Sequence, residues 1–128
     1  MDRPLAAFAA GLLAAGVMLG AFGAHGLKDI LDTYSTAVYE KAVFYHFVHA
    51  LGALLVALLP ALGGITRRTA RVIGALLLVG VLIFSGSLYL IAVTGVTKLG
   101  MITPLGGTAF IVAWCMLAYQ LAVPPKTS

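Results

Sequence analysis

Charged residues are scarce in this chain of 128 residues. Eight Lys and Arg and four Asp and Glu make up 9% of the sequence, whereas 62% of the residues are hydrophobic and the mean hydropathy is +1.08. A water-soluble domain covers its outside with polar side chains, and this chain has too few of them to do so. The composition therefore excludes a soluble domain and indicates an integral membrane protein.

The chain also lacks the patterns on which several common functions depend. Its single cysteine, Cys115, excludes an intramolecular disulfide. The net charge of +4 comes from scattered residues without a continuous basic helix, so we expect no nucleic-acid partner. The sequence has neither a G-x-S-x-G nucleophile elbow nor a glycine-rich phosphate loop. Because no catalytic constellation is complete, we expect a protein that is not an enzyme.

Four long apolar stretches separate the few charges. The predicted membrane spans are residues 4–24, 42–62, 71–95 and 104–123. About 20 helical residues cross a hydrocarbon core, and lipid offers no partner to a bare backbone group, so each stretch is expected to be a helix. The first stretch is longer than the apolar region of a signal peptide, so we expect it to be retained. With no linker between domains, residues 1–128 are predicted to form one all-α membrane four-helix bundle.

Small polar residues and prolines predict where the helices begin. Ser35 or Thr36 is expected to cap the second helix. That helix is expected to start before the membrane, because one stripe of residues at helical spacing runs along it. The stripe consists of Tyr39, Ala42, His46, His49 and Ala53. Thr103 followed by Pro104 predicts the cap and the first residue of the last helix.

The positive residues fall unevenly on the two sides of the predicted spans. One side holds Arg3, Arg67, Arg68, Arg71 and Lys126, and the other holds Lys28, Lys41 and Lys98. Short cytoplasmic loops carry the excess of Lys and Arg. We therefore expect a multi-pass protein with both termini in the cytoplasm.

Small residues indicate where the helices pack. Helices in lipid associate by close approach of their backbones, which glycine permits. The predicted packing residues are Gly16, Gly20, Gly23, Gly86, Gly106 and Gly107. They are compatible with packing inside one chain and with self-association through a glycine face, and the sequence does not choose between the two.

Three histidines are the titratable side chains expected to approach the membrane interior, where such residues are often functional. His46 and His49 are three residues apart and so share a helix face, and His25 closes the first helix on the same side. Neutral imidazoles bind metal and haem, but no standard ligand spacing is present. The alternatives are a proton relay or a substrate contact, and a structural role in which His49 bonds a loop carbonyl or the hydroxyl of Ser85 or Tyr89.

Four segments of the chain together resemble a known family. They read GAFGAHGL at residues 20–27, HAL at 49–51, FSGSLY at 84–89 and ITPLGG at 102–107. In this order they are similar to the domain-of-unknown-function 423 family, small bacterial inner-membrane proteins related to eukaryotic transmembrane protein 256. The resemblance covers about residues 5 to 121. It implies a four-helix, multi-pass protein of the cell inner (cytoplasmic) membrane without a settled activity.

The resemblance also orders the candidate site residues. The candidate polar or ligand-binding cluster consists of His25, His46, His49, Ser85, Ser87, Tyr89 and Thr103. All of these except His46 fall in the segments that carry the resemblance, which implies that they are the functional candidates. His46 stands where family members more often have Gln, which favours His25 with His49 as the pair that would bind a metal or haem.

These observations lead to one main interpretation and two alternatives. We expect a non-enzymatic packing or assembly partner in a larger membrane complex, or a small homo-oligomer, embedded in the lipid bilayer and without a cofactor. The first alternative is a metal- or haem-binding module that uses His25 and His49. The second is a channel or carrier for a small solute.

Overall fold

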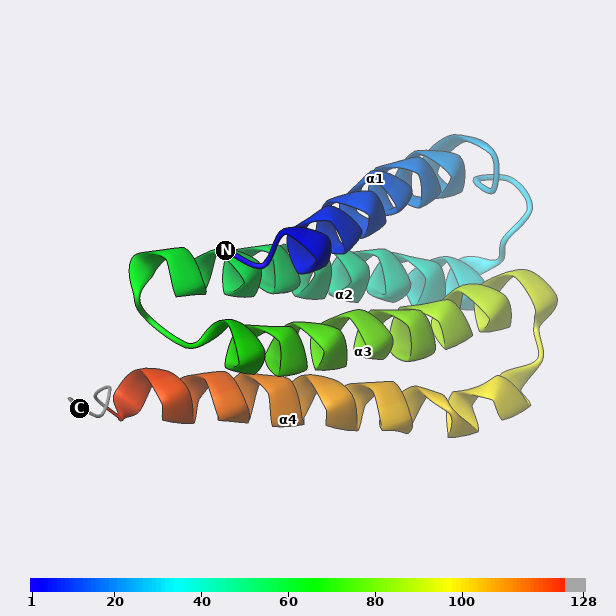
Figure 1. Ribbon diagram of the computed structural model, residues 1–128. Coiled ribbons are helices and arrows are strands. Elements are labelled where there is room, and N and C mark those ends of the chain that lie inside the picture. The colour runs from blue at the N-terminus through cyan, green and yellow to red at the C-terminus, as the bar shows by residue number, and fades with distance from the viewer. Residues whose placement is uncertain (124–128) are drawn as a thin grey trace.

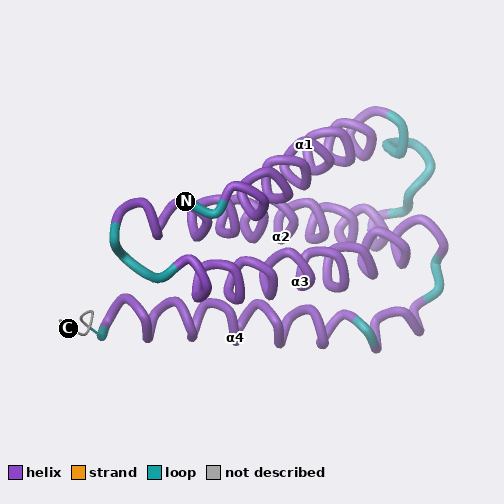
Figure 2. Tube along the Cα trace, viewed as in Figure 1, coloured by secondary structure: helices purple, strands orange, loops and turns teal. Residues whose placement is uncertain are grey.

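The computed structural model describes residues 1–123, which form four long helices and two short helical turns (Figures 1 and 2). The long helices are α1 (Arg3–His25), α2 (Thr33–Leu58), α3 (Arg67–Thr94) and α4 (Thr103–Ala122). The 3₁₀ turns η1 (Leu59–Leu62) and η2 (Thr97–Met101) extend the end of α2 and precede α4. Each of the four long segments is long and apolar enough to cross a membrane, so the predicted all-helical architecture is confirmed.

The helices are arranged around a central pair. Figure 1 shows α2 and α3 side by side, with α1 against α2 and α4 against α3 on the opposite side. In the most apolar stretch of each span, 44% of the residues are buried in α2 and α3, but only 17% in α1 and α4. The two outer helices therefore leave most of their surface to contacts outside this chain.

Two predicted helix caps are wrong. Asp32, not Ser35 or Thr36, caps α2: its carboxylate accepts a hydrogen bond from the Ser35 N–H at 2.7 Å. A carboxylate is a strong acceptor at a helix N-terminus, and its presence lets the helix begin at Thr33. Thr103 is the first residue of α4 and makes no cap, because its hydroxyl bonds another helix. The backbone N–H of Leu105 instead bonds the Ile102 carbonyl at 3.0 Å.

The N-terminus is fixed at one end of the bundle by Asp2, which is only 1% exposed. Its backbone N–H donates to the Ala57 carbonyl of α2, and its carboxylate accepts from the Leu5 N–H and from the Arg71 guanidinium of α3 at 2.8 Å. The Leu5 hydrogen bond, with Arg71 beside it, holds the pKa of Asp2 below its usual value although burial opposes the shift. One residue thus connects three helices.

Candidate functional site

Two side chains of α2 bond backbone carbonyls of α1. Tyr39 donates its hydroxyl hydrogen to the Leu19 carbonyl, and His46 Nε2 lies 2.6 Å from the Leu12 carbonyl oxygen. A carbonyl can only accept, so Nε2 of His46 carries the hydrogen. The two bonds are seven residues apart on both helices, which run antiparallel, and they hold α1 against α2 in a fixed register.

Two glycines make these carbonyls accessible. Gly16 and Gly23 each lie four residues after a bonded carbonyl, and the carbonyl of an α-helix points toward the residue four positions later. A Cβ at Gly23 would overlap the Tyr39 ring, and one at Gly16 would lie 3.2 Å from the Phe47 ring and 3.4 Å from the His46 ring. Both glycines thus lie in the contact between α1 and α2, and their lack of a side chain leaves room for the hydrogen bonds.

Tyr89 of α3 extends the connection to a third helix. Its hydroxyl lies 2.9 Å from His46 Nδ1, and because Nε2 already carries the ring hydrogen, Tyr89 is the donor. Tyr89 also packs edge-on against Tyr39, with ring centroids 5.2 Å apart. We call Tyr39, His46 and Tyr89, with the Leu12 and Leu19 carbonyls, the three-helix network. Both nitrogens of His46 are used in it.

His49 lies on a different face of α2 and does not join this network. Its Nδ1 donates to the Tyr45 carbonyl one turn earlier at 2.8 Å, and its ring stacks on Phe110 of α4 at a centroid distance of 3.5 Å. The expected bond from His49 to Ser85 or Tyr89 is therefore wrong. Positions three residues apart on an α-helix point in directions that differ enough for His46 to face α1 and α3 while His49 faces α4.

The two serines of the candidate cluster connect other helix pairs. The Ser85 hydroxyl, which is fully buried, donates to the Ala42 carbonyl of α2 at 2.8 Å. The Ser87 hydroxyl donates to the Phe84 carbonyl at 2.9 Å, so it accepts from the Thr103 hydroxyl of α4, which lies 2.6 Å away. The polar side chains of α3 thus bond both of its neighbours.

The remaining predicted glycines differ in what surrounds them. A Cβ at Gly106 would lie 2.5 Å from the Phe84 backbone nitrogen, so α4 approaches α3 closely at this point. Gly20 and Gly107 would meet side chains only at ordinary contact distances, 3.6 Å and 3.7 Å. Gly86 has no atom within 4 Å of such a Cβ, so it faces away from the neighbouring helices and takes no part in the packing inside the chain.

The structure does not bring His25 and His49 together. The register of α1 on α2 puts His49 level with about Ala9, whereas His25 is the exposed last residue of α1. Sixteen residues of helix correspond to roughly 24 Å, far more than a shared metal permits. Within residues 1–123, no group of three His, Cys, Asp or Glu side chains is placed to hold a metal ion.

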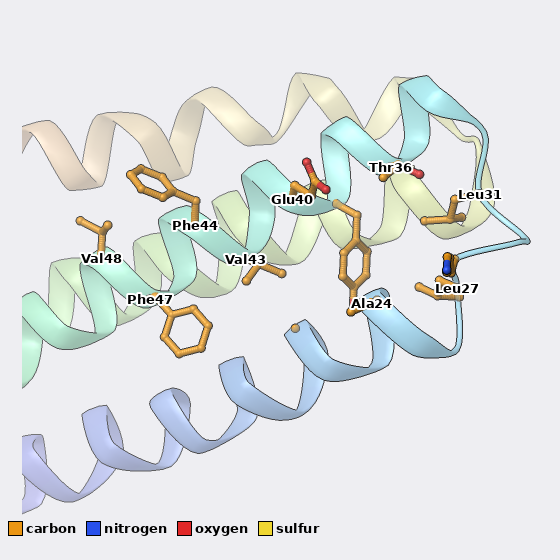
Figure 3. A pocket seen from close by; sticks show the side chains of 13 residues that line it. Ala24, Leu27, Leu31, Thr36, Glu40, Val43, Phe44, Phe47 and Val48 are labelled. Carbon is orange, nitrogen blue, oxygen red and sulfur yellow. The ribbon is translucent and has the colours of Figure 1, made fainter.

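A groove between α1 and α2 was not predicted from the sequence. It encloses about 750 Å³ beside the loop that joins the two helices, and Figure 3 shows Val43 and Phe47 projecting across it toward α1. Most of its lining is apolar, but the loop end carries Lys28, Thr36 and Glu40. The signal in the sequence was the run of small residues on α1, which leaves space opposite the aromatic side chains of α2.

Comparisons with known proteins find relatives that are described as membrane proteins. Residues 19–107 match the family model described as Protein of unknown function (DUF423). The chain is 49% identical over 107 residues to the UPF0382 membrane protein YwdK of Bacillus subtilis, covering 83% of this chain and 84% of the relative. It is 41% identical over 103 residues to a UPF0382 membrane protein of Haemophilus influenzae, covering 80% and 81%. No solved structure matches.

Proposed function

We propose that this chain, which belongs to the DUF423 family of proteins of unknown function, is a non-enzymatic inner-membrane protein that works by lateral association, first of all with further copies of itself. A larger membrane complex in which it is a packing partner is the alternative form of the same proposal. The observation that carries the proposal is the surface of α1, of which only 17% of the spanning residues are buried in the chain.

The exposed side of α1 has the features of a helix-packing surface. Ala7 and Gly11 are four residues apart and border a shallow hollow with Phe8 and Leu12. A Cβ at Gly11 would meet nothing within 4 Å, so this glycine is not explained by packing inside the chain. Small residues at this spacing let two membrane helices approach closely.

The polar side chains of the candidate cluster support a role without catalysis. Ser85, Ser87, Tyr89 and Thr103 all hydrogen-bond neighbouring helices or their carbonyls, and His46 uses both of its nitrogens. Every buried side-chain nitrogen or oxygen between residues 1 and 123 has a hydrogen-bond partner. Groups used in this way stabilise the arrangement of the helices.

The proposed topology places both termini in the cytoplasm. The end of the bundle where Asp2 bonds Arg71 carries four arginines, Arg3, Arg67, Arg68 and Arg71. The opposite end carries three lysines, Lys28, Lys41 and Lys98. The excess of positive charge marks the cytoplasmic side. Lys126, which was expected on the same side as the arginines, lies outside the described residues.

A photo-crosslinking side chain, p-benzoylphenylalanine, at position 11 tests the association in intact membranes. Val79 of α3 is 48% exposed and lies at about the same depth, so the same probe at position 79 is the matched control. We expect position 11 to give an adduct of two chains and position 79 to give much less. An adduct of another mass would identify a larger complex, and equal yields at both positions would refute association through α1.

A further inference from the structure

The groove between α1 and α2 opens on the outer surface of the helix bundle. Its walls come from Gly20, Gly23 and Ala24 of α1 and from Val43 and Phe47 of α2 (Figure 3). Because the relatives of this chain are membrane proteins and the walls belong to apolar helices, the medium at this opening is lipid. A volume of about 750 Å³ falls in the range of about 300–1,000 Å³ typical of sites for small ligands.

The groove is held open by the bonded packing around it. Tyr39, which lines the groove, is fixed by its hydrogen bond to the Leu19 carbonyl and by its edge contact with Tyr89. Gly23 lies directly against the Tyr39 ring, so the distance between the two helices is set at this point. The site is therefore formed before any ligand enters, which lowers the entropic cost of binding.

The polar end of the groove carries one charge of each sign. Lys28 comes from the connecting loop and Glu40 from the second turn of α2, with the Thr36 hydroxyl between them in sequence. Among residues 1–123 the ion pair joins Asp2 and Arg71 at the opposite end of the bundle, and neither Lys28 nor Glu40 is ion-paired with another residue of this range. Both charges are thus available to a ligand.

We propose that this groove binds one phosphatidylethanolamine molecule. An acyl chain lies along Val43 and Phe47, the phosphate contacts Lys28, and the ammonium group donates hydrogen bonds to Glu40. We choose a lipid as the occupant because the groove is open to the bilayer and is apolar along its length and polar at one end. A phospholipid has the same arrangement of apolar acyl chains and a polar headgroup. A zwitterionic headgroup complements a site with one positive and one negative side chain.

Other headgroups fit less well. Phosphatidylglycerol would satisfy Lys28 but place no positive charge at Glu40. Phosphatidylcholine carries the positive charge, but its quaternary nitrogen has no N–H to donate to a carboxylate. We therefore expect phosphatidylethanolamine to bind about two- to fivefold more tightly than either, the range that partly exposed charged contacts provide.

Native mass spectrometry of the full-length protein in detergent, with each of the three phospholipids added in turn, tests the proposal. Ala24→Phe fills the groove, and Ala21→Phe, which adds the same side chain at an exposed position of α1 outside the groove, is the matched control. We expect Ala24→Phe to lower the affinity for phosphatidylethanolamine by about tenfold. Ala21→Phe should leave the affinity unchanged.

A second variant tests the headgroup contact. Glu40→Gln keeps the size of the side chain and removes its charge, so it should abolish the preference for phosphatidylethanolamine. Equal binding by Ala24→Phe and Ala21→Phe, or equal binding of the three lipids to the wild type, would overturn the proposal. So would loss of a two-chain species, with lipid binding intact, in Ala24→Phe, because the groove would then be a protein interface.

Discussion

The three-helix network makes a quantitative prediction for His46. Leucine at this position has nearly the same volume as the imidazole but removes both of its bonds, to the Leu12 carbonyl and to the Tyr89 hydroxyl. Interhelical hydrogen bonds in membrane proteins contribute about 0.6 kcal/mol on average and up to about 2 kcal/mol. His46→Leu should therefore lower the free energy of unfolding by about 1–3 kcal/mol, the upper value applying if the Tyr89 hydroxyl is left without an acceptor.

Two further variants separate hydrogen bonding from loss of shape. His46→Gln keeps one N–H donor and one oxygen acceptor at the end of the side chain, so it should retain most of the stability. Tyr89→Phe removes the hydrogen bond between the Tyr89 hydroxyl and His46 and leaves the bond between His46 and the Leu12 carbonyl intact. The double variant His46→Leu with Tyr89→Phe leaves no hydroxyl without a hydrogen-bond partner. It should therefore lose less unfolding free energy than the sum of the losses in the two single variants, with a coupling of about 1 kcal/mol.

Reversible unfolding in mixed micelles, followed by circular dichroism and by the fluorescence of the single Trp114, measures these differences. Strict additivity of His46→Leu and Tyr89→Phe would refute the bond between the two side chains. A His46→Leu protein as stable as the wild type would refute the structural role of the network. His46→Gln as unstable as His46→Leu would show that the imidazole ring itself is required.

Three more predictions concern other parts of the chain. Gly23→Val should lower the thermal unfolding temperature because its side chain would overlap a tyrosine ring, whereas Gly86→Ala should raise stability by up to about 1 kcal/mol, since nothing lies near it and alanine favours a helix. The pKa of Asp2 is below its ordinary value of 3.8, so the ionised carboxylate stabilises the fold fully at neutral pH, and this stabilisation is lost as the pH falls through and below 3.8. Asp2→Asn should therefore make the free energy of unfolding less dependent on pH in this range. His49→Ala should lower the unfolding temperature because Phe110 loses the ring on which it stacks. We also expect elemental analysis and visible spectra to show no stoichiometric metal or haem in either this variant or the wild type.

Much of the architecture follows from the sequence because it depends on lengths and apolar content. A run of about 20 apolar residues has only the helix available to it in lipid, so the four helices could be predicted without any knowledge of their contacts. The α2 stripe was also predictable, because Tyr39, His46 and His49 are all buried as helical spacing requires. The caps were less accessible, since Asp32 and Ser35 both suit an N-terminus and only the backbone decides between them.

The partners of individual side chains could not be predicted, because periodicity gives a face of a helix but not the helix that it meets. The resemblance to the family favoured His25 and His49 as a pair, whereas the register of α1 on α2 places them far apart and gives the central position to His46. The groove depends on how α1 is inclined to α2, which is set by the contacts of Gly16 and Gly23. No property of a single helix determines that inclination.

The two proposed surfaces of α1 do not compete for the same residues. The exposed hollow around Gly11 lies in the first half of the helix, whereas the groove uses Gly20, Gly23 and Ala24 in the second half. Association through the first half would leave the groove open to lipid, and a bound lipid would leave Gly11 free. The network that fixes α1 on α2 lies between them, at Leu12 and Leu19, so both surfaces depend on the same hydrogen bonds. Failure of the lipid experiment would consequently leave the crosslinking result unaffected, whereas loss of His46 should weaken both.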